Sequence, residues 1–490
     1  MKNKLELFGK YLAEPKRPFG FFLLLFAGSV LLRFLSFHYA VIDHDESTYM
    51  VIADRLLQGD QLYVDVVDNK PPGIFYLFAA WQALVGKSII AFRFLAALMV
   101  ALTAFFLYRA AQNLLNHESK AVGSAFSFLF LVSLYRYGLP ANTELFFLPL
   151  TALGLYFFSL QDSPPRKQLG LSALAALSLG LAFSIKYVVI ADVVALTFFF
   201  NFWREKKYPK INLGQIGRTV MQVGVFTLPL AGVVFYYWKS GELNSFWYYT
   251  IEAGADYSGQ NKGEQWYKTL LDFHLKYLPF LLLFYFLWFR SKQENLKKLV
   301  ALWYLMVWGI ILYLQKGFDH YFLQLLLPIS LLLGELHSAK RSIKDKFKKW
   351  YPKALVGAAV LLVLIIWGNQ SYFWTREDQV RKLTKALKEE VKPTDEILCG
   401  QDCQLIPYLL DLKPISKIVH PTLLYNHFEL YNIKAAVEVG KLLDKKPAYV
   451  IFREDKFFVT ALRKRLHEEY ELKDKFGKIK LYQRSKAEGH

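Results

Sequence analysis

Cysteine is almost absent from this chain. Only Cys399 and Cys403 occur among its 490 residues. Two cysteines exclude a disulfide-stapled scaffold and a zinc site built from cysteine thiolates. A single bridge between these two residues stays open if they face an oxidising compartment, and buried thiols in a strand are the alternative.

Acidic residues are also scarce relative to basic ones. The chain carries 60 Lys and Arg against 41 Asp and Glu, for a net charge of +19. The cations gather in short segments between apolar runs, which indicates membrane topology rather than a nucleic-acid groove, so we expect no nucleic-acid partner. Internal repeats are not visible in the sequence, which argues against the repeat-built transporter folds.

Apolar and aromatic residues are abundant instead. Hydrophobic residues make up 54% of the chain and aromatic residues 17%, which is too much for a soluble protein of this length. A mean hydropathy of +0.21 indicates that part of the chain is nevertheless soluble. A span needs about 20 apolar residues. About eleven spans are predicted, near residues 19–39, 89–112, 120–137, 142–160, 168–185, 187–203, 217–238, 270–289, 299–315, 320–337 and 354–369.

The distribution of positive charge predicts how these spans are oriented. The basic N-terminus is followed by the first span without a visible cleavage site, as in an uncleaved signal anchor. Basic loops such as WREKKYPK and SAKRSIKDKFKKWYPK alternate with loops that are poor in Lys and Arg. The positive-inside rule then places the N-terminus in the cytoplasm. We therefore expect a multi-pass integral protein of the plasma membrane (the bacterial inner membrane), surrounded by membrane lipids.

Two long loops and the C-terminal region lie outside the spans. The loops at about 40–88 and 239–269 fall on the face opposite the N-terminus. After residue 370, the helical patterns TREDQVRKLTKALKEEV, NHFELYNIKAAVEVGKLLD and FFVTALRKRLHEEY alternate with the strand-like runs EILCG, AYVIFRE and KIKLYQR. An odd number of spans puts this region outside.

These patterns together predict the fold class. We expect a polytopic α-helical membrane protein with about 11 transmembrane helices and with interfacial helices in the first outside loop. A small C-terminal α/β domain completes it. The predicted division is a transmembrane domain at 1–370 and a soluble extracytoplasmic α/β domain at 371–490.

The stretch DHDES, residues 43–47, places a dense carboxylate cluster just after the first span. Residues 45–58 predict a helix with Asp45 as its N-cap and Gly59 as its stop, lying on the membrane surface. An ordinary cap is therefore one reading of Asp45, and solvated loop charges are one reading of Asp43 and Glu46. The apolar stripe of this helix consists of Tyr49, Ile52, Ala53 and Leu56.

Several motifs in order along the chain resemble a known family. They are the Asp-Glu-x-x-Tyr helix (Asp45, Glu46, Tyr49), GDQLYVDVVDNKPPG around Lys70, ANTELFF around Glu144, and GFDHYFLQLLLP around His320 and Tyr321. This order resembles the polyprenyl-phosphate-sugar transferases of the glycosyltransferase C superfamily, which include protein O-mannosyltransferases and aminoarabinose transferases of lipid A. The likeness covers the first two-thirds of the chain.

The resemblance implies an inverting glycosyltransferase. A loop carboxylate takes the proton of an acceptor hydroxyl as that oxygen attacks the anomeric carbon, and the lipid phosphate leaves. Asp45 matches the base of such families. Glu46 beside it is a second candidate catalytic carboxylate, and Tyr49 is a candidate for binding the substrate. Lys70 matches the lysine before the paired prolines, near the leaving phosphate, and Glu144 matches an acidic residue that opens a later span. The implied partners are a polyprenyl-phosphate sugar donor and a cell-envelope glycan, lipid or protein acceptor.

Cations and donors near the outer face complete the predicted site, because a leaving phosphate needs such groups. Lys186, His320 and Tyr321 are candidates. Lys186 interrupts an apolar run, where an ionisable side chain is functional by default, and snorkelling is its alternative reading. His320 has span capping as its alternative, and Glu144 has a contact with the helix dipole.

No cofactor is predicted, although the Asp-x-Asp of Asp43 and Asp45 resembles sites that hold a divalent cation in sugar transferases. Thr48 and Asn69 stand where lipid A transferases carry Arg and Glu, so the phosphate contacts and metal site of that subgroup are not carried over. Two other functions stay open. One is a lipid-linked sugar flippase or transporter, and the other is a polysaccharide polymerase or ligase that uses the loop at 239–269.

Overall fold

The computed structural model describes residues 18–160, 165–204, 211–255, 266–338, 351–425, 435–454 and 463–485. The chain forms two compact units, each assembled from three separate stretches. The first, called the membrane unit here, comprises Met1–Phe37, Arg93–Phe235 and Asn261–Tyr372. The second, called the mixed unit, comprises His38–Phe92, Tyr236–Gln260 and Phe373–His490.

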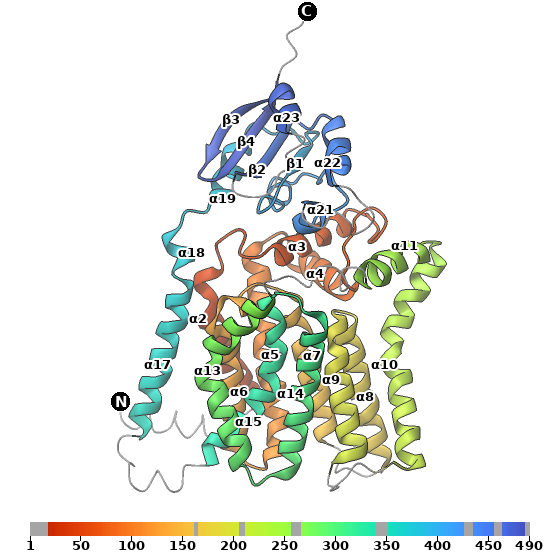
Figure 1. Cartoon of the computed structure of the whole chain (residues 1–490), viewed down its shortest axis with the longest axis vertical. Coiled ribbons are helices and arrows are strands. Elements are labelled where there is room, and N and C mark those ends of the chain that lie inside the picture. Colours follow the sequence, from red (N-terminus) through yellow and green to blue (C-terminus); the bar gives the residue numbers. More distant parts are fainter. Residues whose placement is uncertain are drawn as a thin grey trace, which may run out of the picture. The chain divides into compact units, whose positions relative to one another are not determined.

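The membrane unit is a bundle of apolar helices (Figure 1). Its elements are α2 (Pro18–Arg33), η1 (Phe34–Ser36), α5 (Ile89–Leu115), α6 (Glu118–Leu134), η2 (Arg136–Gly138), α7 (Thr143–Ser159), α8 (Pro165–Phe183), η3 (Tyr187–Val189), α9 (Ile190–Phe198), η4 (Phe199–Trp203), α10 (Leu213–Lys239), α13 (Trp266–Arg290), α14 (Glu294–Leu314), η6 (Asp319–Leu325), α15 (Leu326–Leu333), η7 (Gly334–Ser338) and α17 (Tyr351–Gln370). Helices α7 and α8, α6 and α15, and α9 and α14 pack against one another.

Large apolar side chains stay exposed along these helices. Leu228 on α10 is 59% exposed, and Phe289 on α13 is 74% exposed. Surfaces of this kind are not stable in water. Among the described residues, five helices are long and apolar enough to cross a bilayer, or six if the bent pair at 356–387 is one span. The chain is therefore an integral membrane protein.

The other predicted spans are shorter or interrupted helices. Their counterparts are α6, α7, α8, α9 with η4, and η6 with α15. The chain leaves regular helix between α8 and η3, at Lys186, and winds as a 3-10 helix from Asp319 to Leu325. Irregular backbone at membrane depth is tolerated where protein surrounds it. Eleven transmembrane helices stay a prediction, because length alone does not show which of these shorter helices cross.

The mixed unit joins the first loop to the C-terminal region. Its elements are α3 (His44–Leu57), α4 (Gly73–Val85), α11 (Leu243–Trp247), η5 (Tyr248–Glu252), α18 (Tyr372–Thr375), α19 (Gln379–Leu387), β1 (Ile397–Cys399), α20 (Ile406–Leu409), α21 (Pro421–Tyr425), α22 (Ala435–Asp444), β2 (Tyr449–Arg453), α23 (Arg463–Glu469), β3 (Tyr470–Phe476) and β4 (Ile479–Arg484). One core of buried apolar residues draws on all three stretches of this unit, and it includes Val67, Ala253 and Val450.

The C-terminal region contains one four-stranded sheet, in the order β1-β2-β4-β3 (Figure 1). Strands β1 and β2 are parallel, and β4 is antiparallel to both β2 and β3. The prediction of an α/β region is confirmed, but β3 was missed. Its segment ELKDKF is exposed over most of its length and lacks an apolar alternation. The predicted helices at 426–444 and 457–470 are helical over 435–444 and 463–469. Tyr470 is instead the first residue of β3, and residues 426–434 and 457–462 lie outside the described ranges.

Helix α3 differs in two ways from its prediction. It begins at His44, and its N-cap is Asp43, whose carboxylate accepts a hydrogen bond from the Asp45 backbone N–H at 2.9 Å. Every residue from Glu46 to Arg55 is buried. The expected one-sided apolar stripe is therefore wrong, because protein surrounds the helix where one face was expected to be polar. Helix α4 packs against α3.

The two cysteines are free thiols. Cys399 lies at the end of β1, and Cys403 is buried nearby. Burial raises the pKa of both thiols. The structure thus favours buried strand thiols over a bridge. The predicted division at residue 370 stays a prediction, since the two compact units are interleaved along the sequence.

Candidate active site

The acidic residues of the first loop have different structural positions. Asp43 is the cap, so the reading of Asp45 as an ordinary helix cap is wrong. Asp45 lies in the first turn of α3, where a carboxylate is favoured by the exposed backbone N–H groups. Glu46 follows it in the same turn and is fully buried, so it is not a solvated loop charge.

Two nitrogen donors meet the Asp45 carboxylate. Lys70 Nζ lies 3.2 Å from Asp45 Oδ1, and His420 Nε2 lies 2.9 Å from the same oxygen. The side chains of Asp45, Lys70 and His420 are 14%, 16% and 11% exposed. Little water therefore screens the three groups, and their mutual interaction is stronger than at an open surface.

Lys70 is held from several sides. Its Nζ lies 3.4 Å from Oδ1 of Asp68, which is fully buried, and 5.4 Å from the centre of the Tyr49 ring. The Tyr63 hydroxyl donates to the Lys70 carbonyl at 2.6 Å. Tyr49 itself is buried, and its ring packs on Phe75 and Phe78 of α4. The lysine thus has a fixed position beside Asp45.

A short pairing of two backbone segments sets the positions of Lys70 and His420. Val67 forms an isolated parallel β-bridge with Ile418, and its N–H donates to the Lys417 carbonyl at 2.9 Å. Lys70 comes three residues after Val67, and His420 comes two residues after Ile418. Parallel segments carry the chain in the same direction, so both side chains arrive at the same end of the pairing.

Arg55 ties these segments to the far end of α3. Its guanidinium donates to the Asp65 carbonyl at 2.8 Å and to the Ser416 carbonyl at 3.2 Å, and it pairs with Asp60 at 2.5 Å. One helix therefore presents Asp45 at its start and anchors both flanking segments near its end. A buried guanidinium with several acceptors is suited to such a structural role.

A second histidine lies beside this cluster. His44 Nε2 is 3.0 Å from Asp402 Oδ1, and Arg453 contacts the other oxygen of Asp402 at 2.8 Å. Gln404 Nε2 lies 3.3 Å from His44 Nδ1. Burial lowers the pKa of His44, although the nearby Asp402 carboxylate opposes this.

The other four predicted site residues gather in the membrane unit. Glu144 lies in the first turn of α7, is 1% exposed and forms an ion pair with Lys186. His320 Nε2 lies 4.0 Å from Glu144 Oε1. The Lys186 ammonium lies 4.1 Å from the centre of the Tyr321 ring, and that ring meets the His320 ring at 5.0 Å. Three segments far apart in sequence thus converge on one cluster, in which Glu144 and Lys186 are buried.

The buried pair excludes two simple readings of its residues. Lys186 is 7% exposed, so its ammonium does not snorkel to water. Glu144 contacts a cation as well as the start of its helix, so it does more than meet the helix dipole. A buried ion pair adds little net stability, and such pairs within membrane segments mark substrate or ion pathways.

Sequence reasoning missed the histidine that contacts Asp45. His420 lies 375 residues away from Asp45 along the chain, in a loop without a motif. Asp68 was missed as well, although it stands two residues before Lys70 in a segment that was already singled out. Asp68 directly follows the apolar pair Val66 and Val67, and all three are buried.

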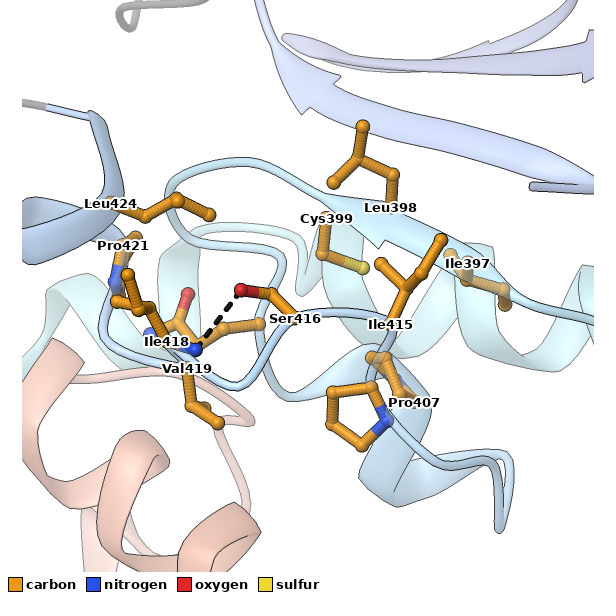
Figure 2. A pocket seen from close by; sticks show the side chains of 12 residues that line it. Ile397, Leu398, Cys399, Pro407, Ile415, Ser416, Ile418, Val419, Pro421 and Leu424 are labelled. Carbon is orange, nitrogen blue, oxygen red and sulfur yellow. Dashed lines mark hydrogen bonds between the residues drawn. The ribbon is translucent and has the colours of Figure 1, made fainter. Parts of the chain in front are cut away.

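The described part of the chain has no cluster of metal-ligating side chains beside these residues. No group of three or more His, Cys, Asp and Glu residues there could hold an ion, and a cation at Asp43 and Asp45 stays a prediction. A small pocket in the mixed unit has a volume of about 30 Å³. Its lining is mostly apolar and includes Ile397, Ile415 and Leu424 (Figure 2). That volume holds about one or two waters.

The bundle and the sheet-bearing mixed unit have the fold seen in solved structures of membrane glycosyltransferases. The chain is similar to the crystal structure of ArnT from Cupriavidus metallidurans bound to undecaprenyl phosphate. It is also similar to the structure of the archaeal oligosaccharyltransferase AglB from Archaeoglobus fulgidus in complex with an inhibitory peptide and a dolichol-phosphate. For ArnT the TM-score is 0.67 at 13% identity, covering 95% of this chain and 98% of that one. For AglB it is 0.56 at 12% identity, covering 89% and 69%. These likenesses show the fold.

Sequence comparisons point the same way. The family described as dolichyl-phosphate-mannose-protein mannosyltransferase matches residues 69–227, which include Lys70, Glu144 and Lys186. Two undecaprenyl phosphate-alpha-4-amino-4-deoxy-L-arabinose arabinosyl transferases of Pseudomonas fluorescens are 22% and 23% identical, over 59% of this chain and 53% and 54% of theirs. The chain thus spans about half the length of the curated relatives it matches. The resemblance that the motifs predicted is confirmed.

Proposed function

We propose that this protein is an inverting membrane glycosyltransferase. It moves a sugar from a polyprenyl-phosphate donor to a hydroxyl of a lipid, glycan or protein acceptor on the outer face of the membrane. The observation that carries the proposal is a poorly exposed carboxylate, Asp45, held between Lys70 and His420. The relatives support the donor class, because ArnT was crystallised with undecaprenyl phosphate and the curated relatives are named as undecaprenyl phosphate-aminodeoxyarabinose arabinosyl transferases.

In the proposed reaction, Asp45 acts as general base. Its carboxylate takes the proton of the acceptor hydroxyl while that oxygen forms a bond to the anomeric carbon. The bond from the anomeric carbon to the phosphate oxygen breaks, its electron pair stays on that oxygen, and the lipid monophosphate leaves. Configuration inverts because the attack comes from the opposite face. A positioned base contributes about 10²- to 10⁴-fold to the rate of such a step.

The remaining predicted residues have proposed roles in binding. Lys70 stabilises negative charge beside the base, and Glu46 and Tyr49 support the first turn of α3. In the membrane unit, Lys186, His320 and Tyr321 bind the donor, and Glu144 holds Lys186 in place. Cationic and hydroxyl groups of this kind balance the charge of a leaving phosphate. The reaction needs no resident metal in this proposal, since a monophosphate leaving group is balanced by lysines.

The proposed location follows from the same chemistry. The protein lies in the bacterial inner membrane with its N-terminus in the cytoplasm and its C-terminal α/β region outside. A lipid-phosphate sugar keeps its head group at the membrane surface, so the base must be held at that level. The basic loops between apolar runs support this orientation.

The proposal is tested by giving the purified full-length protein a panel of polyprenyl-phosphate sugars, with and without a cell-envelope extract as acceptor. Release of free lipid phosphate is measured by mass spectrometry. We expect one donor class to be consumed, and the acceptor extract to increase its consumption. Tight binding of a donor without any release, in either condition, would contradict the proposal and favour the flippase reading.

A further inference from the structure

His420 contacts the Asp45 carboxylate from the C-terminal region. We propose that His420 is a positioning residue, which orients the Asp45 carboxylate for proton transfer. This inference rests on the proposed function. It assigns to the C-terminal region a direct part in the reaction, through a side chain of its own.

The first argument is the freedom of an aspartate side chain. The terminal torsion of a carboxylate has a broad minimum, so the group rotates unless contacts fix it. Lys70 Nζ and His420 Nε2 both contact Oδ1 of Asp45, at 3.2 Å and 2.9 Å. Two donors that reach one oxygen from separate segments restrict rotation of the whole group, which one flexible lysine alone would not do.

The second argument is the rigidity of the segment that carries His420. Within it, the Ser416 hydroxyl accepts a hydrogen bond from the Ile418 N–H at 3.0 Å (Figure 2). The same segment pairs with the first loop at Val67 and accepts a bond from Arg55. The imidazole is thus delivered by a backbone held on both sides, which is a condition for a precise catalytic geometry.

The third argument is the hydrogen bonding of the imidazole itself. Its Nδ1 is buried and has no hydrogen-bond partner among the residues that the structure describes. A buried polar atom left unpaired costs about 1–3 kcal/mol. Packing alone would not favour a histidine here, because an apolar side chain would fill the space without an unpaired nitrogen. The hydrogen bond to Asp45 gives the imidazole a specific role. Nε2–H donation also stabilises the ionised carboxylate, which is the form that accepts a proton.

The test compares His420→Ala and His420→Gln with the wild type, using steady-state release of lipid phosphate. Lys413→Ala is the matched control, because Lys413 makes another contact from the same loop to the first loop, with Asp60 at 2.7 Å, but none with Asp45 in the described contacts. We expect His420→Ala to lower kcat roughly 10- to 100-fold with little change in KM, since the loss is one of alignment. His420→Gln keeps an N–H donor and should recover most of that loss.

The result that overturns the inference is equal kcat for His420→Ala, Lys413→Ala and wild type, or a loss in His420→Ala that His420→Gln does not recover. If His420→Ala does not fold, His420→Met replaces it, because Met fills the site without donating. The proposed function fails separately, when the wild type releases no lipid phosphate from any donor. A working wild type with unaffected His420 variants removes only the positioning role.

Discussion

At the scale of single residues, the structure separates roles that the sequence left together. Asp43 caps α3, whereas Asp45 contacts Lys70 and His420. Asp45 and Lys70 could be predicted because their motifs lie within one short loop. His420 could not, because the contact joins two segments that only the tertiary fold brings together, and an isolated histidine in a loop carries no pattern.

The same scale holds a prediction for Glu144 and Lys186. Removing one partner of a buried ion pair leaves an uncompensated charge, at a cost of about 3–5 kcal/mol, whereas removing both is nearly neutral. We expect Lys186→Met to lower thermal stability in detergent strongly, and Lys186→Met with Glu144→Gln to regain most of it.

A measurement of donor binding then shows whether Lys186 binds the donor or only pairs with Glu144. If Lys186 binds the donor phosphate, the double variant is folded but binds a polyprenyl-phosphate sugar much more weakly than the wild type does, as measured by ligand-induced thermal stabilisation. Donor affinity equal to that of the wild type in the stable double variant would show that the pair is purely structural.

At the scale of elements, helix boundaries and breaks decide where chemistry is possible. Helix α3 presents Asp45 in its first turn because its N-cap is Asp43, two residues before the predicted cap. In the membrane unit, the predicted residues stand where helices begin or are interrupted, at the start of α7, before η3 and within η6. Hydropathy located the apolar runs well. It could not show these interruptions, because a few residues of irregular backbone hardly change an average over about 20 positions.

Helix α3 provides a prediction about its cap. Replacing Asp43 by Ala removes the side chain that accepts the Asp45 N–H, and loss of an N-cap costs about 0.5–2 kcal/mol. We expect Asp43→Ala to lower both stability and turnover, and Asp43→Ser to restore both, because serine caps a helix as well. Thermal unfolding and lipid-phosphate release are the two measurements.

The pair of variants also addresses a cation at Asp43. A serine hydroxyl is a poor substitute for a carboxylate ligand of a divalent cation. If Asp43→Ser is as stable as the wild type but inactive, and excess Mg²⁺ or Mn²⁺ restores its turnover, Asp43 acts as a metal ligand and the capping account is incomplete. Full activity of Asp43→Ser supports the cap.

At the scale of the whole molecule, the sequence predicted the class of fold but not which stretches of the chain assemble into each compact unit. The sequence alone revealed the apolar runs, the soluble C-terminal region and the resemblance to polyprenyl-phosphate-sugar transferases. The mixed unit was not, because it combines His38–Phe92 with Tyr236–Gln260 and Phe373–His490. Its shared core includes Val67 and Ala253. These apolar residues are scattered through loops that the sequence pattern did not connect with one another. The C-terminal region is consequently part of the structure that holds Asp45.

The central claim is that Asp45 is the base of a lipid-phosphate sugar transfer. The most direct measurement is the rate of lipid-phosphate release by Asp45→Asn, compared with the wild type at equal amounts of folded protein. Asp65→Asn is the control, because Asp65 lies in the same loop, and its carboxylate only accepts the Gln61 N–H in the described contacts, which an asparagine can also do. We predict that Asp45→Asn loses about 10²- to 10⁴-fold in kcat and that Asp65→Asn keeps its activity. Equal turnover by Asp45→Asn and wild type would contradict the account and remove Asp45 as the base.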